Sequence, residues 1–145
     1  MGLDVSHDCW HGPYSAFHRW RVQLARVANY PPLDLIDGFR DELLAKPEQP
    51  LISRKPFLRD SLSLLLFHSD CDGGIRWWQC RPLALRLLGL YRESYAVEAP
   101  PRPGCGCWVD PKPARADYDG FRPALMRWIV GLLDAHTARE TVTFG

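Results

Sequence analysis

Apolar positions recur with the 3.6-residue period of an α-helix along much of the chain. The period is clearest between the proline at position 13 and the proline pair at 31 and 32, where large apolar residues stand three or four positions apart. The same pattern returns four more times, bounded by prolines, glycines or polar runs. We therefore predict about five helices, over residues 14–29, 34–46, 57–68, 77–94 and 118–137. Trp20 and Trp128 fall within these helical patterns, and we expect both in the core.

The two ends of the sequence have a different pattern. Residues 3–6 alternate between apolar and polar side chains, as a short strand does, and the tail Thr141–Phe144 is rich in strand-forming residues. We expect these segments to pair and so to join the ends of the chain. Prolines gather at residues 47–56 and 99–116, which predicts irregular excursions there. The predicted fold is a single compact domain over residues 1–145, mainly α, with a minor two-stranded β element.

Composition narrows the function classes. The 145 residues are 46% hydrophobic and 24% charged, as in an ordinary folded domain. Eighteen Lys and Arg against 17 Asp and Glu leave a net charge of +1, which argues against a binder of nucleic acid duplexes or of membrane surfaces. The first residues lack the basic and apolar regions of a signal peptide, and the five cysteines are an odd number. We expect a cytoplasmic protein with reduced thiols.

A first polar cluster occupies residues 7–14, HDCWHGPY. In an extended segment, His7, Cys9 and His11 would point to the same face, because side chains alternate along a strand. Two imidazoles and a thiolate are donors that Zn²⁺ accepts, so half of a zinc site is one interpretation. The other is that these residues form caps and turns at the start of the first helix.

A second cluster, HSDCDGG, lies between two predicted helices at residues 68–74. Asp70 and Asp72 flank Cys71, and the following glycines allow a tight turn or a close approach to a ligand. The segment is not a calcium-binding EF-hand loop, because Arg81 stands where that loop needs Glu. Two interpretations remain: a carboxylate pair that binds a ligand or cation, and capping groups for the neighbouring helices.

These motifs resemble a group of small phage and prophage proteins with no established activity. The resemblance rests on GLDVSHDCWHGPYSAFHRWR, LLLFHSDCDGGI and FRPALMRWIVGLLDAH, and it covers most of the chain except residues 31–56 and 99–116. The elements CWHG-x-Y and HSDCDG look like the signature of the group. The resemblance implies a bacterial host cell as the location. It also implies one shared site formed by Cys9, Trp10, His11, Gly12, Tyr14, His68, Ser69, Asp70, Asp72 and Gly73.

Our favoured hypothesis is a protein that binds a small ligand. By analogy with other small phage proteins, it would capture a nucleotide-type signal and so counter the antiviral defence of the host. Aromatic rings would stack on a base, arginines would bind phosphate, and a carboxylate would bind ribose hydroxyls. The residues expected in these roles are Trp10, Tyr14 and Trp77, then Arg21 and Arg76, then Asp70 or Asp72. Such proteins often form homo-oligomers that build sites between chains.

Two other function classes remain open. A metal-dependent hydrolase would hold zinc or manganese to activate water, if the two clusters meet in space. Its candidate ligands are His7, Cys9, His11, His68, Asp70 and Asp72. An inhibitor of a host enzyme would instead act by protein–protein interaction, with Trp77, Trp78 and the 99–116 segment as contacts. We favour binding over catalysis.

Overall fold

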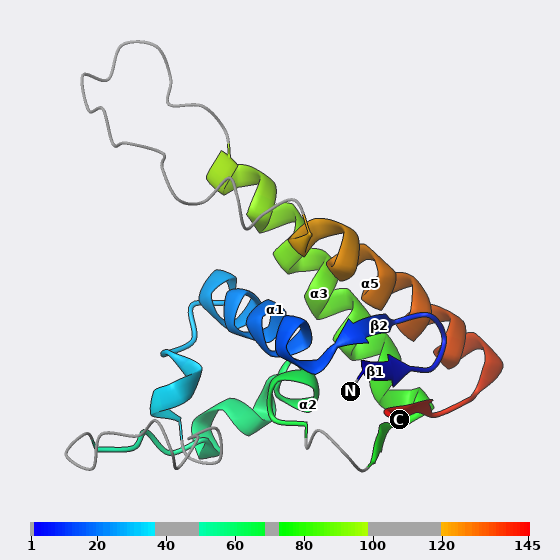
Figure 1. The fold of residues 1–145 in the computed structure, drawn as a ribbon, viewed down its shortest axis with the longest axis horizontal. Helices are drawn as coiled ribbons and strands as arrows, with labels where there is room; N and C mark the ends of the chain where they lie inside the picture. Colours follow the sequence, from blue (N-terminus) through cyan, green and yellow to red (C-terminus); the bar gives the residue numbers. More distant parts are fainter. Residues whose placement is uncertain (1, 37–49, 69–72, 99–119) are drawn as a thin grey trace.

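A computed structural model describes residues 2–36, 50–68, 73–98 and 120–145. The fold is mainly helical, with small antiparallel sheets (Figure 1). The helices are α1 (Tyr14–Val27), α2 (Ser63–Leu66), α3 (Trp77–Glu98) and α5 (Phe121–Ala138), with short 3₁₀ helices at Leu33–Leu35 and Lys55–Arg59. The strands are β1 (Gly2–Val5), β2 (Trp10–Pro13), β3 (Gly74–Ile75) and β4 (Val142–Thr143).

The two long helices α3 and α5 pack side by side in opposite directions (Figure 1). Two hydrogen bonds between side chain and backbone set their register. At one end, Arg122 Nη2 donates to the carbonyl oxygen of Ser94 at 3.0 Å. At the other end, Nδ1 of His136 lies 3.0 Å from the carbonyl oxygen of Trp77. The start of α3 therefore lies beside the end of α5.

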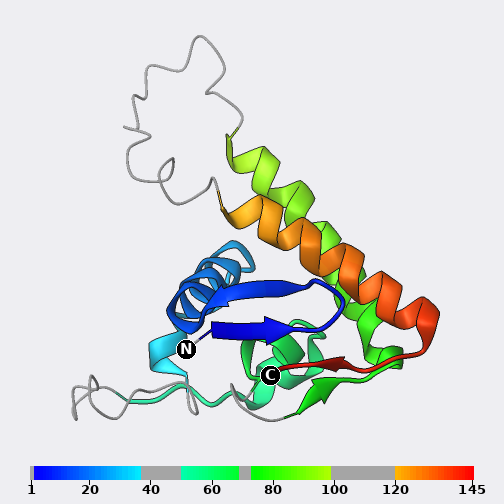
Figure 2. The ribbon, with the colours of Figure 1, turned by 45° about the vertical axis from the view of Figure 1, so that its right-hand side comes forward.

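This helix pairing brings the short strands together. β3 directly precedes α3 and β4 follows α5, and the two strands pair antiparallel through Gly74↔Thr143 and Ile75↔Val142. Beside them, β1 and β2 form a hairpin (Figure 2). The expected contact between the chain ends is present as a single bridge, Val5↔Phe144. The longer ladders are β1–β2 and β3–β4, so the β element is not the simple two-stranded pair that we predicted.

An aromatic layer forms the centre of the core, where α1, α5 and the end of the chain meet. Trp20 and Trp128 stack with ring centroids 5.9 Å apart and planes inclined by 10°. Phe17 lies 6.0 Å from each of these indoles, and Phe144 lies 5.9 Å from Trp128. The helical period of α1 and α5 predicted that Trp20 and Trp128 are core residues, and their burial confirms it.

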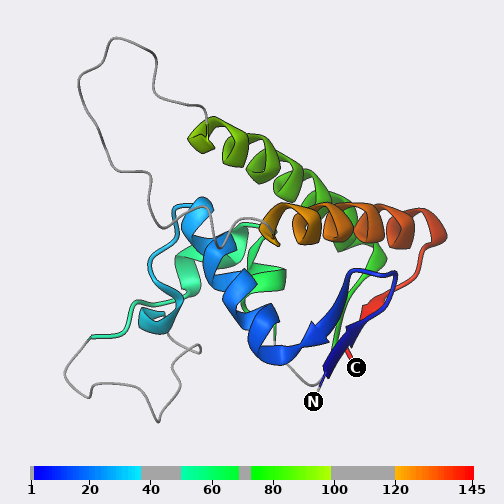
Figure 3. The ribbon, with the colours of Figure 1, turned by 45° about the horizontal axis from the view of Figure 1, so that its top comes forward.

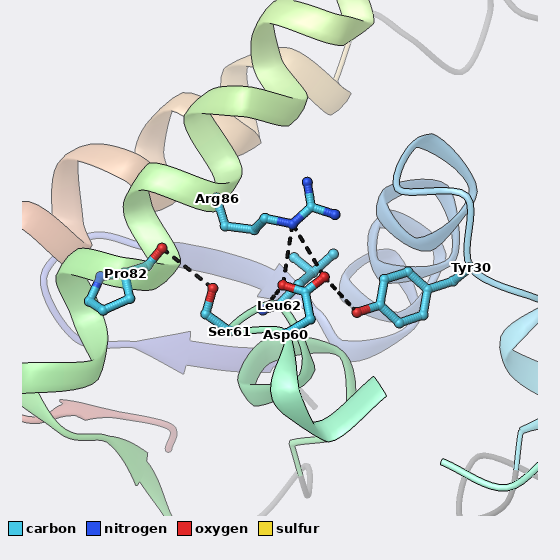
Figure 4. Close-up of polar contacts among 6 residues, drawn as sticks. All are labelled: Tyr30, Asp60, Ser61, Leu62, Pro82 and Arg86. Carbon is cyan, nitrogen blue, oxygen red and sulfur yellow. Dashed lines mark hydrogen bonds and ion pairs between the residues drawn. The ribbon is translucent and has the colours of Figure 1, made fainter. Parts of the chain in front are cut away.

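Asp60 connects three elements where the regular structure is weakest (Figure 4). One carboxylate oxygen accepts the Tyr30 hydroxyl at 2.8 Å, and Arg86 Nε of α3 lies 3.2 Å from both oxygens. The carboxylate also accepts the backbone N–H of Leu62 at 3.1 Å, which caps the turn that leads into α2. Desolvation of Tyr30 and its hydrogen bond to Asp60 raise the pKa of this phenol. The α1 end, α2 and α3 are thus held by one carboxylate.

The predicted helices agree with the structure to different degrees. Those over 14–29, 77–94 and 118–137 correspond to α1, α3 and α5. The helix over 57–68 is wrong in detail: Asp60 has extended backbone (ψ 130°), so a 3₁₀ helix and the one-turn α2 replace it. Of 34–46, the described part continues the Leu33–Leu35 turn into a bridge between Ile36 and Ile52, and residues 37–46 lie outside the described ranges. In the described part of the chain, no helix has the length and apolarity to cross a membrane.

Gly131 and Gly89 provide a matched test of the packing on α5. A Cβ added at Gly131 would lie 2.5 Å from Cys9 Sγ and from the His7 carbonyl oxygen, whereas a Cβ at Gly89 would meet nothing within 4 Å. We expect Gly131→Ala to lower the free energy of unfolding by about 1–3 kcal/mol through overpacking. Gly89→Ala should raise it by about 0.5–1 kcal/mol, because alanine restricts the unfolded chain.

Urea unfolding followed by circular dichroism measures both changes. Equal stabilities of the two variants would show that the hairpin turn does not press on α5.

Candidate functional site

The first polar cluster forms the turn of the β1–β2 hairpin. His7 and Asp8 both have positive φ angles, 58° and 55°, and Cys9 N–H bonds back to the Ser6 carbonyl at 3.4 Å. Consecutive positive φ angles are the signature of a type I′ turn, which usually contains Asn-Gly. The segment is therefore not extended from 7 to 11, and the expected common face of His7, Cys9 and His11 does not exist.

The three proposed metal ligands of this cluster point to different places. His7 Nε2 lies 3.2 Å from Glu140 Oε2. Cys9 is fully buried against Gly131, and burial, followed by nearby Cys80, raises the pKa of its thiol to about 12. His11 stays exposed on β2. Within residues 2–36, 50–68, 73–98 and 120–145, no three His, Cys, Asp or Glu side chains are grouped as a metal site requires. Asp70 and Asp72 lie outside those ranges.

His11 is held between two carboxylates on the outer face of the hairpin. Its Nδ1 lies 2.5 Å from Asp4 Oδ1 on β1, and its Nε2 lies 2.7 Å from Asp8 Oδ1 in the turn. A doubly protonated imidazole can donate to both oxygens at once. The hydrogen bond to Asp4 contributes most to raising the pKa of His11, and Asp8 adds to it. This arrangement fastens the strained turn to both strands.

Arg21 has a structural role in place of the phosphate contact that we expected. It is 2% exposed, and its guanidinium donates to the His68 carbonyl oxygen at 3.2 Å and to the Tyr14 hydroxyl at 3.3 Å. Its carbon Cζ lies 4.8 Å from the ring centroid of Phe17. Desolvation lowers the pKa of Arg21 to about 10, so the side chain stays charged at neutral pH. Arg21 thus ties α1 to the start of the second polar cluster.

Some described residues of the two signature motifs contact the same aromatic layer, whereas Cys9 and His11 lie elsewhere. The His68 ring stacks on Phe144 with centroids 3.8 Å apart, and Gly73, with φ 118°, approaches His68 closely. Trp10 packs on Phe17 at 5.2 Å and therefore lies on the same aromatic layer. Gly12 also has a positive φ, 151°, beside the Trp10 indole. Ser69, Asp70 and Asp72 of the predicted site lie outside the described residues.

A second group of side chains gathers where α3 begins and α5 ends. We call it the α3 start cluster; it consists of Arg76, Trp77, Trp78, His136 and Arg139. The Arg76 guanidinium lies 5.2 Å from the Trp78 ring centroid, and that of Arg139 lies 5.8 Å from Trp77. The two indoles meet edge to face at 5.8 Å, and His136 lies 5.8 Å from Trp77. These distances are those of cation–π and aromatic pairs.

Three of the five residues in this cluster were candidates from the sequence. Arg76, Trp77 and Trp78 are consecutive and stood out beside the HSDCDGG motif. His136 and Arg139 belong to the last turn of α5 and its left-handed C-cap, where Arg139 has φ 57°. A basic residue near a helix C-terminus is a common capping signal and does not reveal a partner 60 positions earlier in the chain. The helix pairing was needed to find it.

Two histidines give a direct test of the hairpin electrostatics by NMR titration. Because its carboxylate partners raise the pKa of His11, we expect its midpoint above the ordinary value of about 6.5, and Asp4→Asn should lower it. The stabilisation from these contacts is fully present below about pH 6.5 and is lost as the pH rises through the folded-state pKa. His18 serves as the internal control, because burial and then Arg21 lower its pKa. A His11 midpoint at or below that of His18 would contradict the geometry.

No protein-family model, no curated protein and no solved structure matches the chain.

Proposed function

We propose that this protein binds a small anionic ligand with an aromatic ring, of the nucleotide type, at the α3 start cluster. The observation that carries the proposal is the exposed Trp78, 49% accessible, with the Arg76 guanidinium over its ring and a second guanidinium–indole pair beside it. Indole and guanidinium planes both stack on a nucleobase. Arginine also binds phosphate oxygens with two parallel N–H groups.

The backbone around the cluster favours an anion as well. Arg76 N–H donates to Gln79 Oε1 at 3.0 Å, so a side chain of the first turn caps α3 and fixes where the helix starts. The start of a long helix carries a partial positive charge, and Arg76 and Arg139 add two full charges. The neighbouring acid Glu140 has its Oε2 3.2 Å from His7 Nε2. With two arginines beside this acid, a local excess of positive charge coexists with a near-neutral chain.

The chain that leads into the cluster is held in place by its packing against β4. Gly74 lies directly on β4: a Cβ there would come 2.6 Å from Thr141 Cγ2 and from the Val142 carbonyl oxygen. The lack of a side chain at Gly74 therefore lets β3 pair closely with β4 just before α3 begins. The HSDCDGG motif leads into β3 and from there directly into the cluster. In this proposal its two carboxylates contact the sugar or the exocyclic amines of the ligand.

The finer part of the proposal concerns the biological role. We infer that binding without turnover removes a nucleotide signal of host antiviral defence, as the resemblance to small phage proteins suggests. The ligand stacks on Trp78 and its phosphate is held by Arg76 and Arg139. In this proposal Trp10, Tyr14, Arg21 and His68 do not touch the ligand directly.

Calorimetric titration with purified protein tests the site. The probes are mononucleotides and cyclic dinucleotides, with nucleosides and inorganic phosphate as separate arms. We expect nucleotides to bind and both Trp78→Ala and Arg76→Ala to weaken binding by about tenfold or more, since stacking on one aromatic ring contributes about 1–3 kcal/mol.

The matched controls are Leu58→Ala and Arg59→Ala in the 3₁₀ helix Lys55–Arg59, which are exposed side chains outside the cluster. Both should bind as the wild type does. The proposal fails if no nucleotide binds, or if the two control substitutions weaken binding as much as the two cluster substitutions.

A further inference from the structure

The side of the α3/α5 pair that faces away from the core carries an apolar stripe. Met126, Val130 and Leu133 stand at successive turns of α5, four and three residues apart, and all are exposed. Val130 is 50% and Leu133 41% accessible. Spacing of four and three is that of the seam residues of a helix that packs against another helix. Figure 3 shows α1, α2 and the strands together on one side of the two helices.

Leu85 of α3 is exposed at the same level of the helix pair as this stripe. The contacts between Trp77 and His136 and between Ser94 and Arg122 fix the register of the two helices. In that register, Leu85 lies beside the turn of α5 that contains Val130. Leu85 is 57% exposed, the highest value among the large apolar residues of the described ranges. Surface apolar residues scattered singly need no explanation, but four exposed ones gathered at one level of a helix pair do.

Two residues of opposite charge lie along one side of the stripe. Arg127 precedes Val130 by three positions and Asp134 follows it by four, so both lie on the same flank of α5. Both side chains are exposed, and neither makes a hydrogen bond or ion pair with any residue that the structure describes. The two charges lie at nearly equal distances from Val130. When a second copy of this helix packs antiparallel, each positive charge therefore faces a negative charge of the other copy.

We propose that this face binds a second copy of the same chain, with the two α5 helices antiparallel and crossing near Val130. In a two-fold symmetric pair, the same patch is used on both subunits. Arg127 then faces Asp134 of the partner subunit, and the same pair forms again on the other side of the axis. The apolar residues Met126, Val130, Leu133 and Leu85 are covered alongside the two ion pairs. This inference is independent of the ligand site, because its residues lie outside the α3 start cluster.

Sedimentation velocity over a concentration series tests the proposal with the full chain. We expect twice the mass of the 16.6 kDa chain for the wild type. Val130→Glu should be monomeric where the wild type is dimeric. Leu58→Glu, at an exposed apolar residue away from α5, should dimerise like the wild type. A wild type that stays monomeric, or a Val130→Glu variant that still dimerises, would overturn the proposal.

Charge reversal tests the antiparallel geometry itself. Arg127→Glu alone and Asp134→Arg alone each place like charges opposite each other twice, so each should raise the dimer Kd by about tenfold. An equimolar mixture of the two variants should recover wild-type affinity, because in the heterodimer every facing pair is again opposite in charge. Both substitutions are on the surface, and thermal unfolding of each variant confirms that it is folded. A mixture that stays as weak as its components would show that these flanks do not face each other.

Discussion

The antiparallel packing of α3 on α5 is the constraint on which the other contacts depend. Since β3 precedes α3 and β4 follows α5, the pairing of the helices places these two strands side by side. β4 and the residue after it then connect to β1, and Asp4 and Gly145 exchange two backbone hydrogen bonds of 2.9 Å. The hairpin reaches α5 only because Gly131 has no side chain at the point of contact. One helix pair thus determines where both polar motifs of the chain are presented.

Two buried or half-buried charged side chains form hydrogen bonds with backbone groups at the ends of α2. Short helices such as α2 have few backbone hydrogen bonds of their own, and their ends need other partners. Arg21 takes up carbonyl oxygens at the end of α2, and Asp60 accepts the Leu62 N–H at its beginning. The intervening apolar residues, Leu62, Leu65 and Leu66, can then be fully buried. The polar residues here hold a weakly helical segment in the core, a role that residue type alone does not reveal.

The elements that follow from a local pattern of residues could be predicted from the sequence. Those that depend on contacts with residues far away in the chain could not. The periods of α1, α3 and α5 are long and clear, so these helices and the core positions of Trp20 and Trp128 were predicted correctly. Residues 57–68 contain no proline or glycine that would mark a boundary, and Asp60 interrupts them through contacts with Tyr30 and Arg86. The His7–Asp8 turn lacks the Asn-Gly signature of its type, so the sequence left open whether this segment is extended or forms a turn. Arg139 meets Trp77 only through the tertiary fold.

The aromatic layer has a consequence for the order of folding. Trp20 Nε1 donates to the Phe121 carbonyl oxygen 101 positions later in the chain, and Phe17 packs on Trp128 and Phe144. During synthesis, α1 and the hairpin therefore leave the ribosome long before the residues that cover their apolar faces. Closing such long loops costs entropy and slows folding. The first third of the chain therefore stays partly apolar and uncovered until the last helix and strand have been synthesised.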